Sequence, residues 1–525
     1  MSGRSETAAR SSATGAPSLT PAEIIAAARA TLDDDGRAWV VGGAVRDELL
    51  GRPVGDLDLV VEGPAEPFAR RLADRLGVPV FSPSERFASF RVVAPGRHVD
   101  VAPLRGPDLA ADLAVRDATV NAIAREIVAE PGAWGGGAAL AAGPLTDPLG
   151  GRADLACGRL RLCSPTALDE DPLRVLRLTR VSSSLRFEPD TAALGAARHA
   201  APGLAGVPGE RLRDELSALL AAASPAPARA LRLLADLGAL AVVLPELDGL
   251  RGVGQNLYHH HDVFEHTLEA LGTVSGVVAQ LGGDGFLAPP IEAGLPDVPS
   301  IVPVSWAVLL HDIGKPGARQ VDETGRILFW HHDRIGRDML VEVGSRLRLS
   351  RHFVDYLGVL VRQHLRLGFL VREQPLTRRA LARYRRDVTP YVFESVVVSL
   401  CDRLATRGEK TSRASVARHY RLARSVWSGV MKVPVPHFLS GDDVMQILGI
   451  EPGHAVGQAL EALEEEIEAG EIRDAAAARG FLLDWWYSDE GPTGADRRKD
   501  GDSPGEGGSV SGHAPGHDQV HRPGV

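Results

Sequence analysis

Cysteine, lysine and aromatic residues are scarce in this chain of 525 residues. The three cysteines, Cys157, Cys163 and Cys401, exclude a disulfide framework and lack the spacing of a zinc site. No run of about 20 apolar residues occurs, so no membrane span is indicated. The first residues lack the apolar segment of a secretory signal. Together these absences predict a cytoplasmic protein that does not bind membranes.

Positive charge is outweighed by negative charge, with a formal net charge of -10. This balance argues against a protein that coats nucleic acid non-specifically, although it is compatible with a local basic face. Arginine supplies almost all of the positive charge, and its planar guanidinium suits bidentate contacts with phosphate.

The chain is too long for a single hydrophobic core, so we expect three or four domains. Residues 19–165 alternate helical and strand patterns and predict an α+β domain with a small sheet. Helices are expected at 21–32 and 67–76, strands at 39–41 and 57–61, and a hairpin over 90–101. From about residue 166 the pattern is almost wholly helical. Residues 1–18 and 488–525 have the composition of disordered segments.

The sequence Gly42-Gly43-Ala44-Val45-Arg46-Asp47, followed by Asp56-Leu57-Asp58, is the most informative feature. Residues two apart on a strand share a face, so both carboxylates can hold hard cations, and Mg²⁺ prefers such oxygen ligands. The two glycines precede a predicted helix and would let backbone N–H groups approach a triphosphate.

These motifs resemble, in order and spacing, the active-site signature of the tRNA nucleotidyltransferase and bacterial poly(A) polymerase superfamily. The resemblance implies that Asp56 and Asp58 bind Mg²⁺ and are catalytic, with Gly43 and Arg46 at the nucleotide. Asp100 is the best candidate for a third catalytic carboxylate, because its predicted strand could neighbour that of Asp58.

Val115-Arg116-Asp117-Ala118-Thr119-Val120-Asn121-Ala122 resembles the family's nucleotide-binding motif. Arg116, Asp117 and Asn121 match it, whereas Val115 stands where the family has a further arginine. We expect a helix here, which would place Asp117 and Asn121 on one face. Residues 147–155 resemble the family's flexible loop, and the Gly/Ala stretch 132–143 before it has the composition of a disordered insertion.

Glu170-Asp171-Pro172-Leu173-Arg174 resembles the motif that selects the incoming base, in which aspartate and arginine pair with the base edges of CTP or ATP. We expect Asp171 and Arg174 on one helical face, since they lie three residues apart. The resemblance also implies roles in nucleotide binding for Arg177 and Arg211.

A second series of histidines and aspartates resembles the HD metal-dependent phosphohydrolases. His266, His311, Asp312 and Asp402 follow or interrupt helical apolar runs, and His332 and His364 resemble the extra histidines of two-metal HD proteins. Imidazole with carboxylate suits a divalent transition metal. The roles of His259, His260, His261 and His331 are left open. The expected ligands are His266, His311, Asp312, His332, His364 and Asp402.

The resemblance implies an N-terminal nucleotidyltransferase head, followed by a helical neck that binds RNA and nucleotide, an HD domain and a helical C-terminal segment. The expected bounds are 1–18 (disordered), 19–165 (head), 166–248 (neck), 249–428 (HD), 429–487 (C-terminal) and 488–525 (disordered).

We expect a template-independent enzyme that adds CCA to the tRNA 3′ end from CTP and ATP, with an HD domain that hydrolyses phosphoesters. Three alternatives stay open. The first is a poly(A) polymerase or an enzyme adding part of CCA. The second is an HD phosphohydrolase with a vestigial RNA-binding polymerase module, and the third is a purely RNA-binding or structural role. The oligomeric state is left open.

Overall fold

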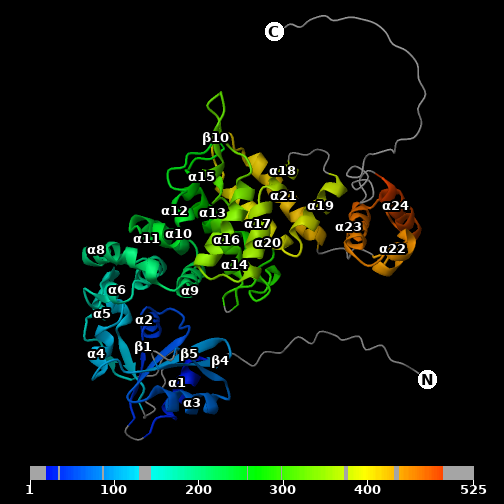
Figure 1. Ribbon diagram of the computed structural model, residues 1–525. Helices are drawn as coiled ribbons and strands as arrows, with labels where there is room; N and C mark the ends of the chain where they lie inside the picture. The colour runs from blue at the N-terminus through cyan, green and yellow to red at the C-terminus, as the bar shows by residue number, and fades with distance from the viewer. Residues whose placement is uncertain are drawn as a thin grey trace, which may run out of the picture. The chain divides into compact units, whose positions relative to one another are not determined.

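The computed structural model describes residues 19–33, 36–84, 88–128, 143–256, 258–296, 298–371, 377–430 and 437–488. The chain forms two compact units (Figure 1). The first comprises the chain to Arg372 and Asp387–Trp427, and the second comprises Glu373–Arg386 and the chain from Ser428. The predicted disordered ends and the 132–143 insertion lie outside the described residues, apart from Ser488 and Gly143.

A mixed sheet with the strand order β3-β4-β5-β2-β1-β6-β7 forms the N-terminal part of the first unit. β2 and β5 run parallel, and the other neighbours are antiparallel. In β2 only Asp58 is exposed, because the other side chains of that strand are apolar and buried. The strands are β1 (Ala38–Val41), β2 (Leu57–Val61), β3 (Val80–Ser84), β4 (Ser89–Ala94), β5 (Arg97–Pro103), β6 (Ala124–Glu126) and β7 (Leu145–Thr146).

Four helices accompany the sheet. In α1 a reciprocal capping box between Thr20 and Glu23 closes the first turn, as its Thr-Pro start predicts. α3 buries Phe68 and Leu72, and it packs against β4 and β5. The helices are α1 (Pro21–Arg29), α2 (Gly43–Leu49), α3 (Ala65–Leu76) and α4 (Leu109–Ala114).

The rest of the first unit is almost wholly helical, as the sequence predicts. Two small two-stranded sheets interrupt it, β8 (Arg159–Leu160) with β9 (Glu188–Pro189) and β10 (Arg319–Val321) with β11 (Ile327–Phe329). The helices before residue 250 are α5 (Gly151–Cys157), α6 (Ala167–Glu170), α7 (Arg174–Leu185), α8 (Thr191–Ala200), α9 (Gly209–Leu220), α10 (Ala226–Asp236), α11 (Ala239–Val243) and α12 (Pro245–Asp248). Those after it are α13 (Val263–Leu281), α14 (Ile301–Leu310), α15 (Lys315–Ala318), α16 (His332–Arg346), α17 (Arg351–Gln363), α18 (Arg366–Leu370), α20 (Val392–Ala405) and α21 (Arg413–Val430).

The neck helix α9 packs directly on the helices that follow residue 250. Trp306 of α14 is fully buried, and its indole Nε1 donates to Ser217 Oγ at 3.2 Å. A Cβ placed on Gly209 would lie 2.2 Å from the carbonyl oxygen of Arg346, so only glycine fits at this position. Helix α9 is therefore tightly packed against α14 and the end of α16.

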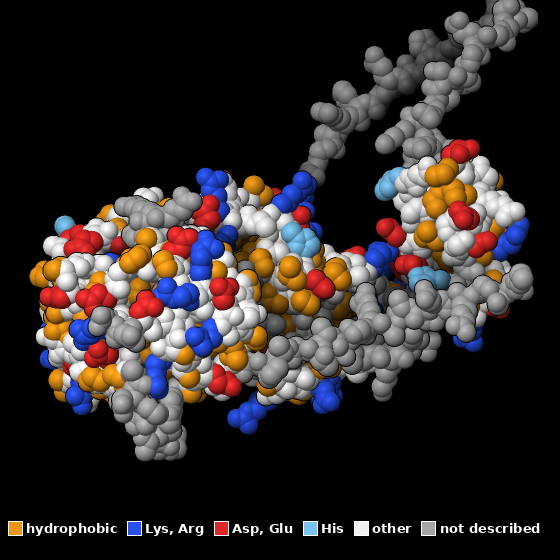
Figure 2. Space-filling view, turned by 90° about the horizontal axis from the view of Figure 1, so that it is seen from below, with side chains coloured by type: hydrophobic (Ala, Val, Ile, Leu, Met, Phe, Trp, Pro, Cys, Tyr) orange, Lys and Arg blue, Asp and Glu red, His pale blue; other side chains and the backbone are white. Residues whose placement is uncertain are grey.

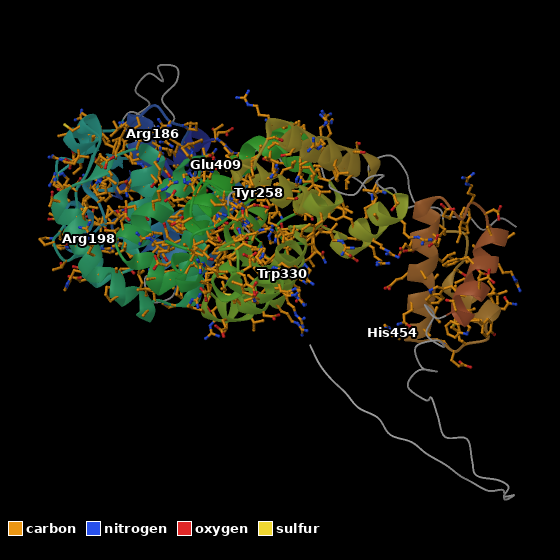
Figure 3. The ribbon with its side chains drawn as sticks, turned by 90° about the horizontal axis from the view of Figure 1, so that it is seen from above. Arg186, Arg198, Tyr258, Trp330, Glu409 and His454 are labelled. Atoms are coloured by element: carbon orange, nitrogen blue, oxygen red, sulfur yellow. The ribbon has the colours of Figure 1, made fainter. Side chains whose placement is uncertain are left out.

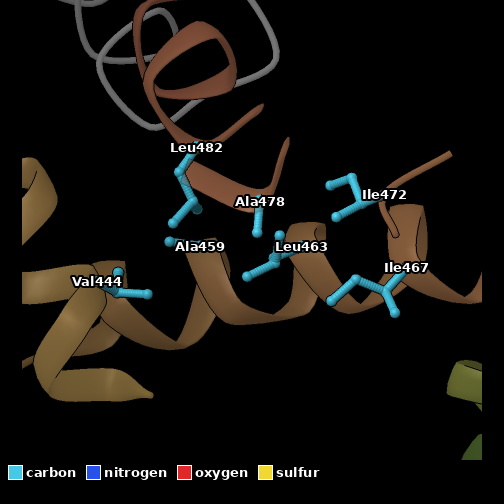
Figure 4. Close-up of a cluster of buried hydrophobic side chains, with 7 residues drawn as sticks. All are labelled: Val444, Ala459, Leu463, Ile467, Ile472, Ala478 and Leu482. Atoms are coloured by element: carbon cyan, nitrogen blue, oxygen red, sulfur yellow. The ribbon is translucent and has the colours of Figure 1, made fainter. Parts of the chain in front are cut away.

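The second unit has its own small core (Figure 4). Seven apolar side chains from α22 (Gly441–Leu448), α23 (His454–Ala469), α24 (Ala475–Tyr487) and the turn between the last two form it. Arg383 and Arg386 of α19 (Arg378–Val388) both pair with Glu465 of α23, which fixes α19 to this core. The core residues are Val444, Ala459, Leu463, Ile467, Ile472, Ala478 and Leu482.

The predicted helix over 115–122 is wrong. α4 ends at Ala114, the chain turns through Asp117, and only Thr119–Asn121 form a 3₁₀ turn. The backbone becomes extended at Ala118 because this residue forms a β-bridge with Leu162. Asp117 and Asn121 nevertheless meet, since Asn121 Nδ2 donates to Asp117 Oδ1 at 3.1 Å.

Two further local predictions also need correction. The predicted loop over 147–155 ends at Gly150, because α5 begins at Gly151. The buried carboxylate of Asp154 fixes this helix, since it accepts hydrogen bonds from Thr119, Arg159 and Arg161. Asp171 and Arg174 do not share a helical face. Asp171 is extended at the end of α6, and Pro172 separates it from α7, which starts at Arg174.

Candidate functional site

A cleft of about 510 Å³ opens over the sheet where β2 and β5 lie side by side. Its walls carry several arginines and aspartates, which is an unusual concentration of opposite charges in one concave site. The lining residues are Val41, Asp58, Leu59, Val60, Ala88, Asp100, Ala102, Pro103, Arg105, Asp112, Arg116, Asp117, Arg174 and Arg177.

The parallel pairing of β2 with β5 makes Asp58 and Asp100 register partners, as the sequence led us to expect. Asp56 lies just before β2, and its Oδ1 accepts from the backbone N–H of His98 at 2.7 Å. Arg91 of β4 holds Asp100 with two bonds, Nε to Oδ1 at 2.7 Å and Nη2 to Oδ2 at 2.8 Å. All three carboxylates raise the pKa of Arg91, chiefly because Asp100 accepts these two bonds.

Gly42 is required at the cleft for two reasons. Its φ of 75° is in the left-handed region that side chains disfavour. A Cβ at this position would also lie 2.9 Å from Oδ2 of Asp58. The first glycine of the motif therefore lets the backbone pass directly beside the Asp58 carboxylate.

The pKa of Asp58 is raised above that of an ordinary aspartate. Although the side chain touches solvent, the cleft walls displace water around the carboxylate, which is the main cause. The positive charges of Arg116 and Arg177 oppose the shift, whereas Asp100 and Asp56 add to it. The carboxylate thus lies where a cation would be strongly favoured.

Asp112 is a site residue that the sequence analysis missed. Its buried carboxylate accepts from Arg105 Nε at 2.9 Å and from Arg116 Nη2 at 2.8 Å. Burial opposes its charge, but the two arginines hold the pKa of Asp112 below its usual value. The spacing of four residues between Asp112 and Arg116 was the available signal, because it is that of a helical ion pair. Asp112 fixes two guanidinium groups at the cleft.

Asp117 is linked to several predicted nucleotide-binding residues. Burial opposes its charge, but Arg177 and bonds from Ala118 and Asn121 hold the pKa of Asp117 below its ordinary value. Asn121 in turn accepts from Arg46 Nη1 at 2.7 Å. A Cβ added to Gly43 would lie 3.2 Å from Arg46 Nη2, so these two residues are close together. Both lie near the cleft residues but not among those that line the cleft.

The predicted base-selecting pair is held by the neck. Arg174 donates to the carbonyl oxygens of Ala167 and Val115, both at 2.9 Å, and it also lines the cleft. Asp171 accepts from Arg211 of α9 at 2.7 Å. Arg211 thus contacts the predicted base-selecting motif, and Asp171 and Arg174 lie on opposite sides of Pro172 in the chain.

The six predicted HD ligands converge at a second, buried site. Nε2 of His266 lies 3.0 Å from Asp402 Oδ1. The ligand atoms fall into two groups of three residues, and within each group they lie within 4.8 Å of one another. One group is His266, His311 and Asp402, and the other is Asp312, His332 and His364. Asp312 joins them, because its Oδ2 lies 3.1 Å from His311 Nε2 and its Oδ1 lies 3.3 Å from His332 Nε2.

Backbone carbonyls orient these imidazoles. Nδ1 of His311, His332 and His364 each lies 2.7 Å from the carbonyl oxygen three residues earlier. Each ring therefore presents Nε2 to the centre, the arrangement in which a second partner fixes the tautomer of a metal-binding histidine. Burial lowers the pKa of His364 to about 3, which keeps it neutral and able to ligate.

These residues fit a divalent metal. Nε2 of His266 and Nε2 of His311 are buried, and they lie 3.0 Å from Asp402 Oδ1 and 3.1 Å from Asp312 Oδ2. Imidazole nitrogens and carboxylate oxygens that converge in this way are the donors that a divalent transition metal prefers. His311 and Lys315 hold the pKa of Asp312 far below its ordinary value against the effect of burial. Lys315, whose Nζ lies 2.6 Å from Asp312 Oδ2, was not assigned from the sequence.

Comparison with known proteins identifies the family. Family models match the chain in order: "Poly A polymerase head domain" at 38–161, "Probable RNA and SrmB- binding site of polymerase A" at 185–250 and "HD domain" at 263–407. The A-adding tRNA nucleotidyltransferase of Deinococcus radiodurans is 36% identical over 462 residues, which cover 85% of this chain and 95% of that protein. The chain belongs to the tRNA nucleotidyltransferase family. The resemblance seen in its motifs is confirmed.

Other members of the tRNA nucleotidyltransferase family are similarly close. The CC-adding enzyme of Thermus thermophilus is 35% identical over 462 residues, covering 85% of this chain and 93% of its own. A solved CCA-adding enzyme in its apo form I superposes with a TM-score of 0.58 at 20% identity, covering 89% of this chain and 94% of that one. The α+β fold class with helical domains after it is therefore confirmed, and the chain is a nucleotidyltransferase.

Acidic and basic side chains are interspersed on the face that Figure 2 shows. Among the described helices, none combines the length and apolar character needed to cross a bilayer. Membership of the family and the HD domain imply dependence on divalent metal ions.

Proposed function

We propose that this nucleotidyltransferase adds CCA to the 3′ end of tRNA, using CTP and ATP. The cleft carries the proposal, because Asp58, Asp100, Arg116, Asp117, Arg174 and Arg177 line one concave surface. The relatives support the tRNA substrate, since their names specify A-adding, CC-adding or multifunctional CCA proteins.

In this proposal Asp56, Asp58 and Asp100 hold Mg²⁺, and Asp100 exchanges its bonds with Arg91 for the ion. Among the described residues these carboxylates do not form one of the tight ligand groups, and Arg91 bonds to both oxygens of Asp100. When bound, Mg²⁺ would lower the pKa of the tRNA 3′-hydroxyl and stabilise the leaving pyrophosphate. Arg116, fixed by Asp112, lies beside Asp58 and would bind the triphosphate.

Base selection is assigned to Asp171 and Arg174. A carboxylate accepts from an exocyclic amine, and a guanidinium donates to ring nitrogen or carbonyl, so the two side chains can distinguish C and A from U and G. Arg211 and the carbonyls of Ala167 and Val115 would hold them in the orientation this requires.

The HD centre is assigned a divalent transition metal and phosphoester hydrolysis. Its donor set of imidazoles and carboxylates suits such an ion. A bound ion would supply a Lewis acid and a nucleophile at neutral pH. His266, His311 and Asp402 would hold an ion as one group and Asp312, His332 and His364 as another, and Asp312 also contacts His311 of the first group.

Addition of only part of CCA is a second candidate. It is favoured by the names of the relatives from Deinococcus, Thermus and Geobacter, which are A-adding or CC-adding enzymes. A poly(A) polymerase would instead extend RNA without stopping at the third nucleotide.

The deciding experiment incubates the purified protein with tRNAs that end before, within and after CCA, each with one labelled NTP. CCA addition predicts incorporation of C on the first, of C or A on truncated ends, and none on the complete end. Addition of C alone or A alone establishes partial activity, and continuing A incorporation on any RNA contradicts both.

A further inference from the structure

Two adjacent histidines and a glutamate form a separate cluster outside the HD centre. His260 and His261 lie in the turn before α13, and Glu269 is on the second turn of that helix. Nε2 of His260 lies 3.3 Å from Glu269 Oε2, and Nε2 of His261 lies 3.8 Å from the same oxygen. The three ligand atoms lie within 4.8 Å of one another. No residue of this cluster belongs to the two groups of the HD centre.

The cluster is held in place from two directions. Nη2 of Arg407 forms an ion pair with Oε1 of Glu269 at 2.9 Å, and Oε2 of the same carboxylate lies beside the imidazoles. The carbonyl oxygen of Tyr258 accepts from the N–H of Gly408 at 2.7 Å and from Thr411 Oγ1 at 3.1 Å. Figure 3 shows Tyr258 and Glu409 close together where these two segments meet. The histidine turn is therefore fixed to the chain that follows α20.

The cluster lacks the partners expected of an ordinary ion pair. Oε2 of Glu269 is buried and has no hydrogen-bond partner, although both imidazoles lie beside it. Two imidazoles that face a carboxylate oxygen without a hydrogen-bond partner form the donor set of a metal site.

We propose that His260, His261 and Glu269 bind a divalent transition metal ion, with Zn²⁺ as the probe of choice. Two imidazole nitrogens and one carboxylate oxygen leave a coordination position open, which water would fill. Arg407 then acts as the outer partner that orients the carboxylate. The ion would hold the 258–262 turn on α13, next to the HD centre, because His259 lies 4.7 Å ring to ring from His266.

The test counts bound zinc in the full-length protein after chelation, reloading with Zn²⁺ and desalting. Two backgrounds are compared, the natural chain and the chain with His311→Ala and Asp312→Ala, which removes the HD centre. In each background, His260→Ala with His261→Ala should lower the zinc content by about one equivalent. Glu269→Gln should weaken Zn²⁺ binding by 10-fold or more in the background that lacks His311 and Asp312. His199→Ala, on the exposed face of α8, is the matched control and should lose nothing.

Loss of zinc in the natural chain alone could reflect damage to the HD centre, so the HD-deficient background decides. If that background binds the same amount of zinc with and without His260 and His261, the site does not exist. Binding of Zn²⁺ should also raise the midpoint of thermal unfolding of the HD-deficient protein. No such rise in the variant lacking both histidines is expected, and an equal rise in both proteins would contradict the assignment. Neither outcome bears on nucleotide addition, which is measured separately.

Discussion

Asp58 is the cleft residue from which the strongest effect is expected. Replacement by alanine, or Asp56→Ala, should abolish nucleotide addition, because each removes a carboxylate proposed to hold Mg²⁺. Loss of a metal ligand corresponds to several kcal/mol of transition-state stabilisation, or about 10³-fold or more in rate. The rate of labelled CTP incorporation in a single turnover measures this loss. Asp74→Ala, an exposed carboxylate on α3, serves as the control, and near-normal rates in either Asp56→Ala or Asp58→Ala would refute the metal assignment.

Asp112 offers a test of positioning at the scale of one residue. Asp112→Asn keeps the shape of the side chain but removes the charge that Arg105 and Arg116 share. We expect KM for the nucleotide to rise by about 10-fold or more while the folded content stays unchanged, since a bidentate charge-assisted contact is worth roughly 1.5–3 kcal/mol.

The matched control for Asp112 is Asp108→Asn, because asparagine can still cap α4 as Asp108 does. Its KM should equal that of the natural protein. A rise in KM that Asp112→Glu restores in part would support positioning, whereas equal losses in kcat and solubility for both Asp112 variants would indicate a folding defect alone.

At the scale of elements, the junction between α6 and α7 should determine which nucleotide is added. Asp171→Ala or Arg174→Ala is expected to reduce discrimination among NTPs by roughly 1–3 kcal/mol, more than either weakens triphosphate binding. Ratios of kcat/KM for CTP, ATP, UTP and GTP measure this. Arg186→Ala, at the other end of α7, is the control. The proposal is wrong if both variants keep the natural preference.

The packing of α21 on α20 should make the first unit sensitive to acid. Burial lowers the pKa of His419 to about 4, and its Nε2 lies 3.0 Å from Ser399 Oγ. The unfolded chain binds a proton near pH 6.5, so between about pH 6.5 and 4 it holds more protons than the folded chain. Stability therefore falls as pH falls through this window, by roughly 3 kcal/mol in total.

His419→Gln should remove this part of the pH dependence. The difference between midpoints of thermal unfolding at pH 7.5 and pH 5 is expected to be smaller in His419→Gln than in the natural protein, and unchanged in the exposed variant His199→Gln. The same difference in all three proteins would show that His419 does not titrate as its burial requires.

Elements with a strong local pattern could be predicted from the sequence. β2 was predicted at its observed bounds because apolar residues surround Asp58, and Thr20 correctly marked the start of α1. The six expected HD ligands came from the resemblance of their order to the HD family, and the structure brings their side chains together.

The errors occur where distant residues decide the local backbone. Ala118 leaves the helical conformation to bridge Leu162, and α5 depends on the contacts of Asp154 with Thr119 and Arg159. Arg91 was missed because it meets Asp100 only through strand pairing. Such contacts follow from tertiary structure, so periodicity alone does not show them. Asp112 is different, because its spacing of four residues from Arg116 was a local signal that was overlooked.

At the scale of the whole molecule, the two sites should be independent in activity. His311→Ala with Asp312→Ala is expected to remove the metal and any phosphoesterase activity of the HD centre but to spare nucleotide addition, because the cleft has its own carboxylates in the head domain. Metal analysis and the tRNA assay on the same preparation measure both. A fall in nucleotide addition matching the loss of metal would show that the sites are coupled.

Independence in activity does not extend to the covalent chain. A fragment ending at residue 250 would keep the head and neck but lose α14, whose Trp306 is fully buried and bonded to Ser217 of α9. The face of α9 that packs on α14 would lose its cover, and Gly209 would lose the backbone of Arg346 that it packs against. Such a fragment should self-associate through this newly exposed surface. The two chemistries of this protein are therefore separable by substitution and not by truncation.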